Sequence, residues 1–341
     1  MPDSHATPMP VCLITQPIHP IGAERLRAAG FEVRPGQAGD EAARIREVAG
    51  ADAVIVREGL TAAMIDAAPR LAVISNHGTG TDKIAVAHAH ELGIPVVSTP
   101  DANIGAVAEH TLMLMLAVAR RAPLADAATR QSDWRYRYAA PMLSLHGKTL
   151  GVIGFGRTGR LVCDMARAGL GMRVLVWSPS APTCEVEAHG ATRVPTLAEL
   201  LTASDVVSLH RPLRADTRHT LDANALRSMK PRAIVINTSR GGLIDETALA
   251  AALKEGRLFG AGLDVFAQEP LCAASPLAGL DNVVLSPHLA GSTEEALHAT
   301  ALQCAEQIID VFAGRQPKHL LDARVWLRRR VPVITPSKEV Q

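Results

Sequence analysis

Aromatic residues are scarce in this sequence of 341 residues. Phe, Trp and Tyr together make up 3% of it, which is too few for a surface on which nucleic-acid bases stack. Neither sign of charge dominates, because 35 Lys and Arg residues balance 34 Asp and Glu residues. Without an excess of basic charge, we expect no binding to nucleic acid or to an anionic membrane surface. These two deficits exclude several large functional classes.

Cysteines are few and form no motif. The five cysteines are far apart and include no CxxC pair, which argues against a disulfide framework and against a thiolate zinc site. We therefore expect no metal and a reduced, cytoplasmic protein. The first ten residues lack the basic start and the apolar stretch of a signal peptide. The most apolar helical stretch, residues 111–119, has about half the length that spans a bilayer, so no membrane anchor is expected.

Apolar runs typical of buried strands alternate with segments of helical spacing. The order strand–helix–strand predicts right-handed βαβ units, and near-continuous apolar strands predict parallel sheets covered on both faces. Ordinary globular composition and a length that suits two domains agree with this fold class. The expected strands cover residues 11–15, 52–56, 71–75 and 95–99 in a first series, and 149–153, 173–177, 205–210, 233–237, 260–265 and 282–286 in a second.

Two long helices indicate how the two α/β domains connect. One, about residues 104–121, precedes the second series of strands, and the other, about 293–312, follows its final strand. If the last helix returns to the first domain, the second domain is inserted into it. We therefore expect a discontinuous substrate domain of residues 1–103 and 291–341, with disordered termini, and an inserted domain of residues 104–290.

A glycine-rich motif, GFGRTG at 154–159, follows an apolar strand and opens an amphipathic helix. In this context Gly154 permits a tight turn, Gly156 lets backbone N–H groups approach a pyrophosphate, and Gly159 allows close packing of helix and strand. The N-terminus of the helix adds partial positive charge. A plain strand-to-helix turn is the less favoured interpretation. The motif predicts a Rossmann dinucleotide-binding domain.

The position that usually selects between the two nicotinamide dinucleotides departs from the pattern. An acid about 20 residues after the glycines normally binds the ribose hydroxyls, but Ser178 stands there. A serine neither grips both hydroxyls nor repels a 2′-phosphate, and Arg211 after the next strand would balance the charge of such a phosphate. Pro179, not an arginine, follows Ser178. The cofactor therefore stays open between NAD and NADP.

Three reactive side chains each come just after an apolar strand: Arg240, Glu269 and His288. Singly, each has a commonplace explanation: a solvated charge in a glycine-rich loop, a turn residue before proline, and one of thirteen histidines. The carboxyl ends of parallel strands, however, line the ligand crevice of an open sheet. Downstream of a phosphate-binding turn, the combination predicts that all three side chains converge beside a dinucleotide.

These residues carry a resemblance to a known family. Over roughly residues 50–315 the chain resembles the D-isomer-specific 2-hydroxyacid dehydrogenases, which include phosphoglycerate dehydrogenase, hydroxypyruvate/glyoxylate reductase and D-lactate dehydrogenase. The resemblance implies a catalytic set of Arg240, Glu269 and His288. It also implies a Rossmann domain, inserted into a flavodoxin-like substrate domain, that forms a homodimer through an arm at about 121–148. The motifs that carry it are residues 77–86, 99–120, 147–160, 229–246, 260–270 and 285–293.

Further roles follow from the resemblance. Asp264 corresponds to the acid that holds the nicotinamide carboxamide, and Thr79 with its neighbour Gly80 to a turn that meets the substrate carboxylate. Arg57 is a candidate for a second anionic group of the substrate, although a surface charge at a strand end explains it equally well. His77, His110 and the pair His88 and His90 are interpreted as structural or solvated. The remaining expected cofactor contacts are Arg157 and Thr158 at the pyrophosphate, and Thr238, Ser239 and Gly291 at the nicotinamide.

The expected chemistry is reduction of a small 2-keto acid, such as hydroxypyruvate, glyoxylate or 3-phosphohydroxypyruvate, to its D-2-hydroxy acid. His288 suits proton delivery to the carbonyl oxygen, Glu269 would fix its tautomer, and Arg240 would bind the substrate carboxylate in a fork. Two alternatives remain. One is a dinucleotide-sensing, corepressor-like interaction protein, which would bind the cofactor without turnover. The other is formate or phosphite oxidation; the formate enzymes pair the histidine with glutamine, so Glu269 argues against formate alone.

Overall fold

The computed structural model describes residues 9–37, 39–139 and 142–332. The chain divides into two compact units: the described residues up to Asn103 together with those from Thr293 onward form the first, and Ile104 to Ser292 form the second. The termini, expected to be disordered, and residues 140 and 141 of the expected dimer arm lie outside the described residues. Each unit is described separately.

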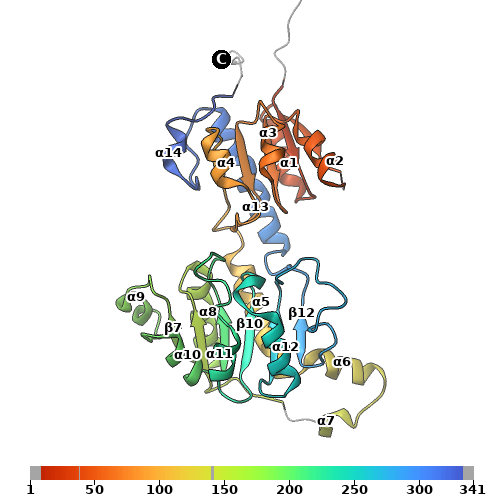
Figure 1. Ribbon diagram of the computed structural model, residues 1–341, viewed down its shortest axis with the longest axis vertical. Coiled ribbons are helices and arrows are strands. Elements are labelled where there is room, and N and C mark those ends of the chain that lie inside the picture. The colour runs from red at the N-terminus through yellow and green to blue at the C-terminus, as the bar shows by residue number, and fades with distance from the viewer. Residues whose placement is uncertain (1–8, 38, 140–141, 333–341) are drawn as a thin grey trace, which may run out of the picture. The chain divides into compact units, whose positions relative to one another are not determined.

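The first unit contains a five-stranded parallel sheet among its described residues, in the order β2-β1-β3-β4-β5 (Figure 1). This order is that of flavodoxin-like sheets. The strands are β1 (Val11–Ile14), β2 (Glu32–Pro35), β3 (Ala53–Val56), β4 (Val73–Asn76) and β5 (Val96–Val97). The helices are α1 (Pro20–Ala28), α2 (Glu41–Val48), α3 (Ala62–Asp66), α4 (Val86–Glu91), α13 (Glu294–Phe312) and α14 (Ala323–Trp326).

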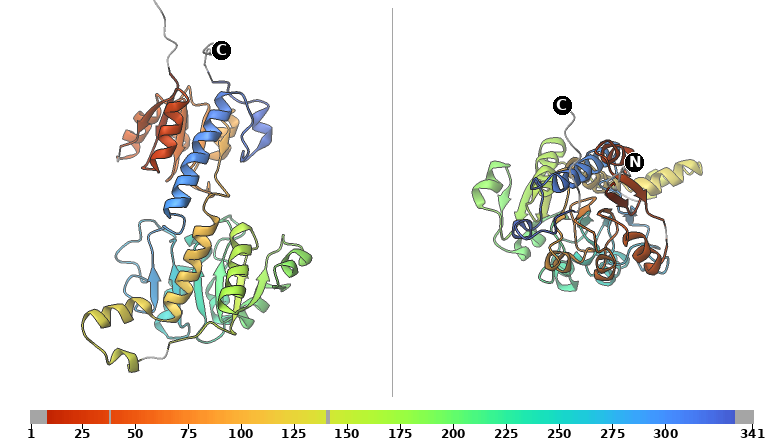
Figure 2. Two further views of the ribbon diagram at one scale, coloured as in Figure 1. Left: turned by 180° about the vertical axis from the view of Figure 1, so that it is seen from behind. Right: turned by 90° about the horizontal axis from the view of Figure 1, so that it is seen from above.

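Both faces of this sheet are covered, which explains why its central strands are apolar throughout. Val54 faces a core that includes Ile65 of α3. The next residue, Ile55, faces the opposite core, which includes Leu26 of α1 and Ile308 of α13. Figure 2 shows α1 and α13 packed side by side. The helix expected near residues 293–312 is thus part of the first unit, where it closes one face of the sheet.

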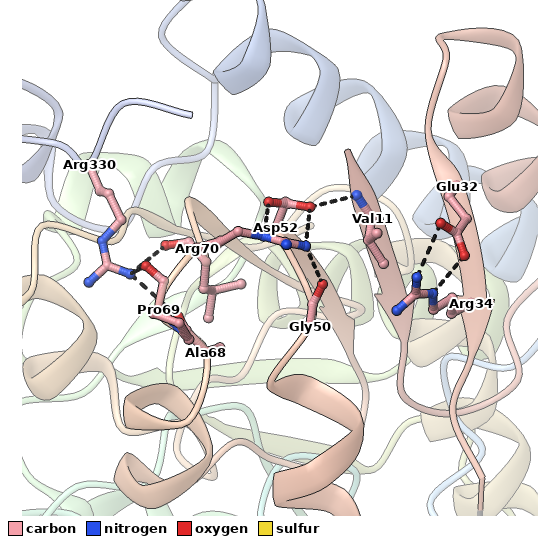
Figure 3. A network of polar contacts seen from close by, with 10 residues as sticks. Val11, Glu32, Arg34, Gly50, Asp52, Ala68, Pro69, Arg70 and Arg330 are labelled. Carbon is pink, nitrogen blue, oxygen red and sulfur yellow. Dashed lines mark hydrogen bonds and ion pairs between the residues drawn. The ribbon is translucent and has the colours of Figure 1, made fainter. Parts of the chain in front are cut away.

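Polar contacts tie the chain ends of the first unit together (Figure 3). The carboxylate of Asp52 accepts the backbone N–H of Val11 at 2.8 Å and the Nε–H of Arg70 at 2.9 Å. Arg330 donates through Nη1 to the carbonyl oxygen of Pro69 at 2.9 Å and to those of residues 68 and 71 at 3.4 and 3.2 Å. The segment after α14 is therefore fastened to a turn more than 250 residues earlier.

The second unit contains a seven-stranded parallel sheet among its described residues, in the order β12-β11-β10-β9-β6-β7-β8. Numbered from β6, the order 3-2-1-4-5-6 with one added edge strand is the Rossmann order. The strands are β6 (Thr149–Ile153), β7 (Arg173–Trp177), β8 (Thr192–Arg193), β9 (Val206–Leu209), β10 (Ile234–Asn237), β11 (Gly260–Leu263) and β12 (Val283–Leu285). The helices are α5 (Ile104–Ala119), α6 (Ala122–Arg130), α7 (Tyr136–Ala139), α8 (Arg157–Leu170), α9 (Thr183–Ala188), α10 (Leu197–Ala203), α11 (Ala223–Ser228), α12 (Glu246–Lys254) and the 3₁₀ turn η1 (Gly241–Leu243).

Two cores cover the two faces of the second sheet. Val152 packs with Met115 of α5 and Val162 of α8, and the next residue, Ile153, packs with Leu200 of α10 and Leu253 of α12 on the other face. Helices α5 and α8 lie against each other on the first of these faces (Figure 2). A layer of helices on each face leaves the ends of the strands as the place where ligands reach the sheet.

Two strands were not expected from the sequence, β2 and β8. Both lie at sheet edges and are partly exposed, so neither carries the apolar run by which buried strands are recognised. Among the described residues, none of the helices combines the length and the apolar character that crossing a membrane requires.

Candidate active site

The glycine turn joins β6 to α8 in a space too small for side chains. Gly154 has φ +98°, and a Cβ there would collide with the carbonyl oxygen of His210 and approach Cγ of Arg211 to 2.7 Å. A Cβ on Gly159 would lie 2.5 Å from the carbonyl oxygen of Gly154. A Cβ on Gly156, in contrast, would meet nothing within 4 Å. Gly154 and Gly159 are needed for packing, whereas Gly156 borders open space.

The N-terminus of α8 fits a phosphate group. Gly156 is the N-cap, and no side chain caps the helix, so the N–H groups of its first turn point outward with the partial positive charge of the helix. Arg157 and Thr158 belong to this first turn. The turn lies where the strand order reverses, between β6 and β9, which is the usual ligand crevice of such sheets. These residues fit the pyrophosphate of a dinucleotide.

Ser178 and Arg211 lie at the ends of β7 and β9. Ser178 is buried, with 5% of its surface exposed. The guanidinium of Arg211 stacks over the ring of Trp177, the last residue of β7, at 4.9 Å from the ring centroid. Because Gly154 borders the Arg211 side chain, this stacked pair stands beside the glycine turn. The usual ribose site carries an acid. Here the hydroxyl of Ser178 takes that place, and the guanidinium of Arg211 lies nearby.

The side chains of His288 and Glu269 are in direct polar contact. Nδ1 of His288 lies 3.0 Å from Oε2 and 3.1 Å from Oε1 of Glu269. Glu269 also accepts the backbone N–H of Phe266 at 3.2 Å. A carboxylate can only accept a hydrogen bond here, so Nδ1 carries a proton and donates it to Glu269, which fixes the orientation of the ring. Nε2 is then the nitrogen available for proton exchange with a substrate. The His288 side chain is 47% exposed, and that of Glu269 is 19% exposed.

His288 adopts a left-handed conformation, with φ +53°, that Asp264 stabilises. The backbone N–H of His288 donates to the carbonyl oxygen of Asp264 at 2.8 Å. The Asp264 carboxylate accepts the next two backbone N–H groups, from Leu289 and Ala290, each at 2.9 Å. The residue following them is Gly291. A non-glycine residue at positive φ is strained, so this set of hydrogen bonds holds the turn that presents His288.

Asp264 is fully buried. Burial raises the pKa of its carboxyl, but hydrogen bonds from His110, Ser286 and the two backbone N–H groups outweigh burial and hold that pKa below its usual value. The carboxylate is therefore charged, and both of its oxygens accept hydrogen bonds from groups of the protein itself. Its expected contact with a carboxamide requires a ligand group to reach this buried side chain.

Arg240 follows β10 and precedes η1. Its Nη1 donates to the carbonyl oxygen of Ser239 at 2.7 Å, and its own carbonyl oxygen accepts from Nδ2 of Asn237 at 2.9 Å. A Cβ on the next residue, Gly241, would collide with the backbone of Phe266, which lies in the loop of Glu269. Since β10, β11 and β12 are neighbours, the loops that carry Arg240, Glu269 and His288 leave adjacent strand ends.

The expected nicotinamide contacts Thr238 and Ser239 have internal partners. The Thr111 hydroxyl donates to the carbonyl oxygen of Val107 at 2.8 Å, so the Thr238 hydroxyl is the donor in the 2.9 Å contact with Thr111. Ser239 donates to the carbonyl oxygen of Leu209 at 2.6 Å. These bonds connect the loop after β10 to α5 and to β9.

The expected substrate contacts Arg57, Thr79 and Gly80 belong to the first unit. Arg57 follows β3, at the point where the order of that sheet reverses, and its Nη1 donates to a backbone carbonyl oxygen at 2.9 Å. Thr79 and Gly80 follow the neighbouring strand β4, in a turn that Asn76 supports by donating to the carbonyl oxygens of Gly78 and Gly80 at 2.9 and 3.0 Å. Thr79 is exposed.

Sequence reasoning missed two residues of this site, Ser286 and His110. Nε2 of His110 lies 2.9 Å from Oγ of Ser286, and Ser286 donates to Oδ1 of Asp264 at 2.6 Å. Among the expected groups, the side chains of Glu269 and His288 are in direct contact. Ser286 is the residue two before His288, a position that its sequence motif already contained. Within the described residues, no group of His, Cys, Asp and Glu suits a metal ion.

Comparisons with known proteins agree with this architecture. Residues 112–290 match the sequence model of a family described as "D-isomer specific 2-hydroxyacid dehydrogenase, NAD binding domain". The chain is 41% identical over 314 residues to the D-3-phosphoglycerate dehydrogenase of Methanocaldococcus jannaschii, across 91% of this chain and 59% of that protein. It is 37% identical over 327 residues to a glyoxylate reductase of Thermococcus onnurineus, across 93% of this chain and 97% of that protein.

A similar solved structure is the NADPH-dependent glyoxylate/hydroxypyruvate reductase of Sinorhizobium meliloti, in complex with NADP and malonate. It superposes with a TM-score of 0.84 and 31% identity, over 95% of this chain and 100% of that chain. Together with the two parallel sheets, this similarity confirms the expected fold class. The chain spans only 59% and 57% of the length of the phosphoglycerate dehydrogenases of M. jannaschii and Synechocystis.

We predict that Gly156→Ala weakens dinucleotide binding without disturbing the fold. The added methyl group meets no protein atom within 4 Å, but it occupies the space through which backbone N–H groups reach a phosphate. Fluorescence titrations with NADH and NADPH should show an affinity loss of about tenfold. Gly154→Ala is the matched comparison and should also lower the melting temperature, because its methyl group strikes the backbone of His210. Unchanged affinity in Gly156→Ala would contradict the role of the turn.

Proposed function

We propose that this chain, which belongs to the D-isomer specific 2-hydroxyacid dehydrogenase family, interconverts a small 2-keto acid and its D-2-hydroxy acid. The observation that carries the proposal is the 3.0 Å contact between His288 and Glu269. His288 follows β12, and Arg240 follows β10, two strands away in the same sheet. The nicotinamide dinucleotide, when bound at the glycine turn, supplies or accepts the hydride.

His288 is the proposed general acid and base. Because Nδ1 faces Glu269, Nε2 is the atom that delivers a proton to the carbonyl oxygen during reduction and removes it during oxidation. The carboxylate stabilises the imidazolium that exists before proton delivery and keeps the ring from rotating. This division of work needs the histidine to be reachable by the substrate, and the 47% exposure of its side chain satisfies that requirement.

Arg240 is the proposed substrate anchor. Its guanidinium has the planar fork that matches a carboxylate, and it also polarises a neighbouring carbonyl group. Arg57, Thr79 and Gly80 are proposed to complete recognition of the acid, with Arg57 suited to a second anionic group such as a phosphate. The named relatives fit this range of substrates, because they include a phosphoglycerate dehydrogenase and glyoxylate reductases.

We also propose a homodimer formed through the second unit. The arm that contains α6 and α7 carries large exposed side chains, with Trp134 at 71% and Tyr138 at 79% exposure, which favours burial against a second copy. The cytoplasmic location expected from the sequence stays a prediction.

A panel of keto acids, assayed with NADH and NADPH in parallel, tests the activity. We expect turnover with at least one of hydroxypyruvate, glyoxylate and 3-phosphohydroxypyruvate. A protein that binds a dinucleotide but turns over none of them would support the corepressor-like alternative, and phosphite and formate belong in the same panel to test oxidation of those ions.

For the cofactor we propose NADP rather than NAD. A 2′-phosphate would meet a hydroxyl at Ser178 in place of an acid. The guanidinium of Arg211, which follows β9 two strands away, stacks over Trp177, the residue before Ser178. Burial lowers the pKa of Arg211, and the neighbouring cation Arg214 lowers it further. The carboxylate of Asp216 acts in the opposite direction but does not outweigh them. A phosphate dianion at Arg211 would accept the charge-assisted hydrogen bonds that a guanidinium donates.

Arg211→Gln is predicted to weaken NADPH binding by about tenfold or more, since a charged hydrogen bond to phosphate is lost, and to leave NADH binding nearly unchanged. Ser178→Asp should reverse the preference by repelling the 2′-phosphate and gripping the ribose hydroxyls. The matched control is Arg214→Gln, a nearby exposed arginine. Equal affinity of the wild-type protein for both dinucleotides would contradict the proposal.

His288→Gln is predicted to cut turnover by roughly 10²–10⁴-fold, the usual contribution of a general acid–base group. Dinucleotide affinity should stay close to that of the wild type, because the glycine turn is untouched. Steady-state kinetics and a fluorescence titration on the same preparation separate the two effects. Near wild-type turnover would remove His288 from the mechanism.

Arg240→Lys is predicted to raise KM for the keto acid and to lower kcat. Lysine keeps the positive charge but cannot form the two parallel hydrogen bonds of the guanidinium fork. The measurement is a substrate titration at saturating dinucleotide. Kinetics identical to those of the wild type would show that the fork does not bind the substrate.

A further inference from the structure

The sequence predicted only a structural or solvated role for His110, but the structure places its side chain in polar contact with two other side chains. The residue lies on the second turn of α5, and its side chain is 11% exposed. Its Nε2 lies 2.9 Å from Oγ of Ser286 and 3.5 Å from Oδ1 of Asp264. A histidine that merely fills space or faces solvent would not reach across to the ends of two strands, β11 and β12.

The direction of each hydrogen bond in this group follows from its protons. The Ser286 hydroxyl has one proton, which it gives to Asp264 at 2.6 Å. The oxygen of Ser286 must therefore accept from His110, which requires a proton on Nε2 of that ring. The chain of donors runs in one direction, from His110 through Ser286 to the Asp264 carboxylate.

The same carboxylate holds the backbone beside His288. Asp264 accepts the N–H groups of Leu289 and Ala290 through its side chain and that of His288 through its carbonyl oxygen. A fully buried carboxylate is stable only when donors surround it. Removing one donor therefore weakens the support of the strained His288 turn as well as the contact itself.

We propose that His110 is a positioning residue that fixes the His288 turn through Ser286 and Asp264. The inference rests on the proposed role of His288, because a fixed turn serves catalysis only if that ring exchanges the proton. His110 does not touch the substrate in this proposal. It acts by keeping the orientation of the ring within the narrow range that proton transfer needs.

His110→Leu and His110→Gln form the test pair. Leucine keeps the approximate volume and has no donor, whereas the amide nitrogen of glutamine stands as many bonds from Cβ as Nε2 of histidine does and keeps one. We expect kcat for the keto acid to fall about tenfold in His110→Leu, with little change in the dinucleotide dissociation constant, and to recover in His110→Gln. The control is His88→Leu, which removes a histidine paired with Asp66 at 2.6 Å in the first unit and should leave kcat unchanged.

A second measurement does not depend on turnover. Hydrogen exchange followed by mass spectrometry reports the backbone N–H groups of residues 288–290 directly, and we expect exchange about tenfold faster in His110→Leu than in the wild type and His110→Gln. If no keto acid is turned over by the wild-type protein, the proposed function fails while this measurement still tests the support of the turn. Unchanged exchange in His110→Leu overturns the proposal, and so does a His110→Gln variant as impaired as His110→Leu.

If His110→Leu does not fold, Ser286→Ala and Ser286→Thr replace it. Alanine interrupts the chain of donors, and threonine keeps the hydroxyl. Slower turnover and faster exchange in Ser286→Ala, with recovery in Ser286→Thr, are the expected results. Where all variants fold, the double variant His110→Leu/Ser286→Ala should lose less than the sum of the two single variants, because both residues act on the same carboxylate. Additive losses would overturn the shared path.

Discussion

The candidate site depends on one buried charge, the carboxylate of Asp264. It has no exposed surface, and it binds the backbone N–H groups of Leu289 and Ala290 together with the hydroxyl of Ser286. A buried carboxylate without such donors would cost several kcal/mol. These donors belong to the turn that carries His288. The hydrogen bonds that stabilise the buried charge therefore also fix the conformation of that turn. The half-exposed imidazole of His288, the proposed general acid and base, is carried by a turn that this buried carboxylate holds.

The sheet order explains where the chemistry gathers in each unit. In the second unit the glycine turn leaves β6 and Arg211 follows β9, on either side of the reversal in strand order. The loops of Arg240, Glu269 and His288 leave three adjacent strands at the same edge. In the first unit Arg57 and the turn of Thr79 likewise follow neighbouring strands. Both folds thus carry these loops at the carboxyl ends of parallel strands, where ligands reach such sheets.

Much of this arrangement could be predicted from local sequence. Strands β6 and β7 were located to the residue because each is an apolar run of a sheet covered on both faces, and Glu269 and His288 were identified because each follows such a run. The edge strands β2 and β8 lack that signal. The contact between His110 and Ser286 joins residues 176 positions apart, and no local pattern reports which helical turn will face which strand end. His110 was consequently interpreted as structural or solvated.

One methyl group would be enough to separate two of the proposed catalytic loops. The backbone of Phe266 fills the space beside Gly241, so the turn that bears the Arg240 guanidinium rests directly on the loop that bears the Glu269 carboxylate. Loops in such contact are displaced together rather than one by one. The cation proposed to bind the substrate and the carboxylate in contact with His288 therefore lie on two loops that touch through their backbones, so a shift of one loop is expected to shift the other.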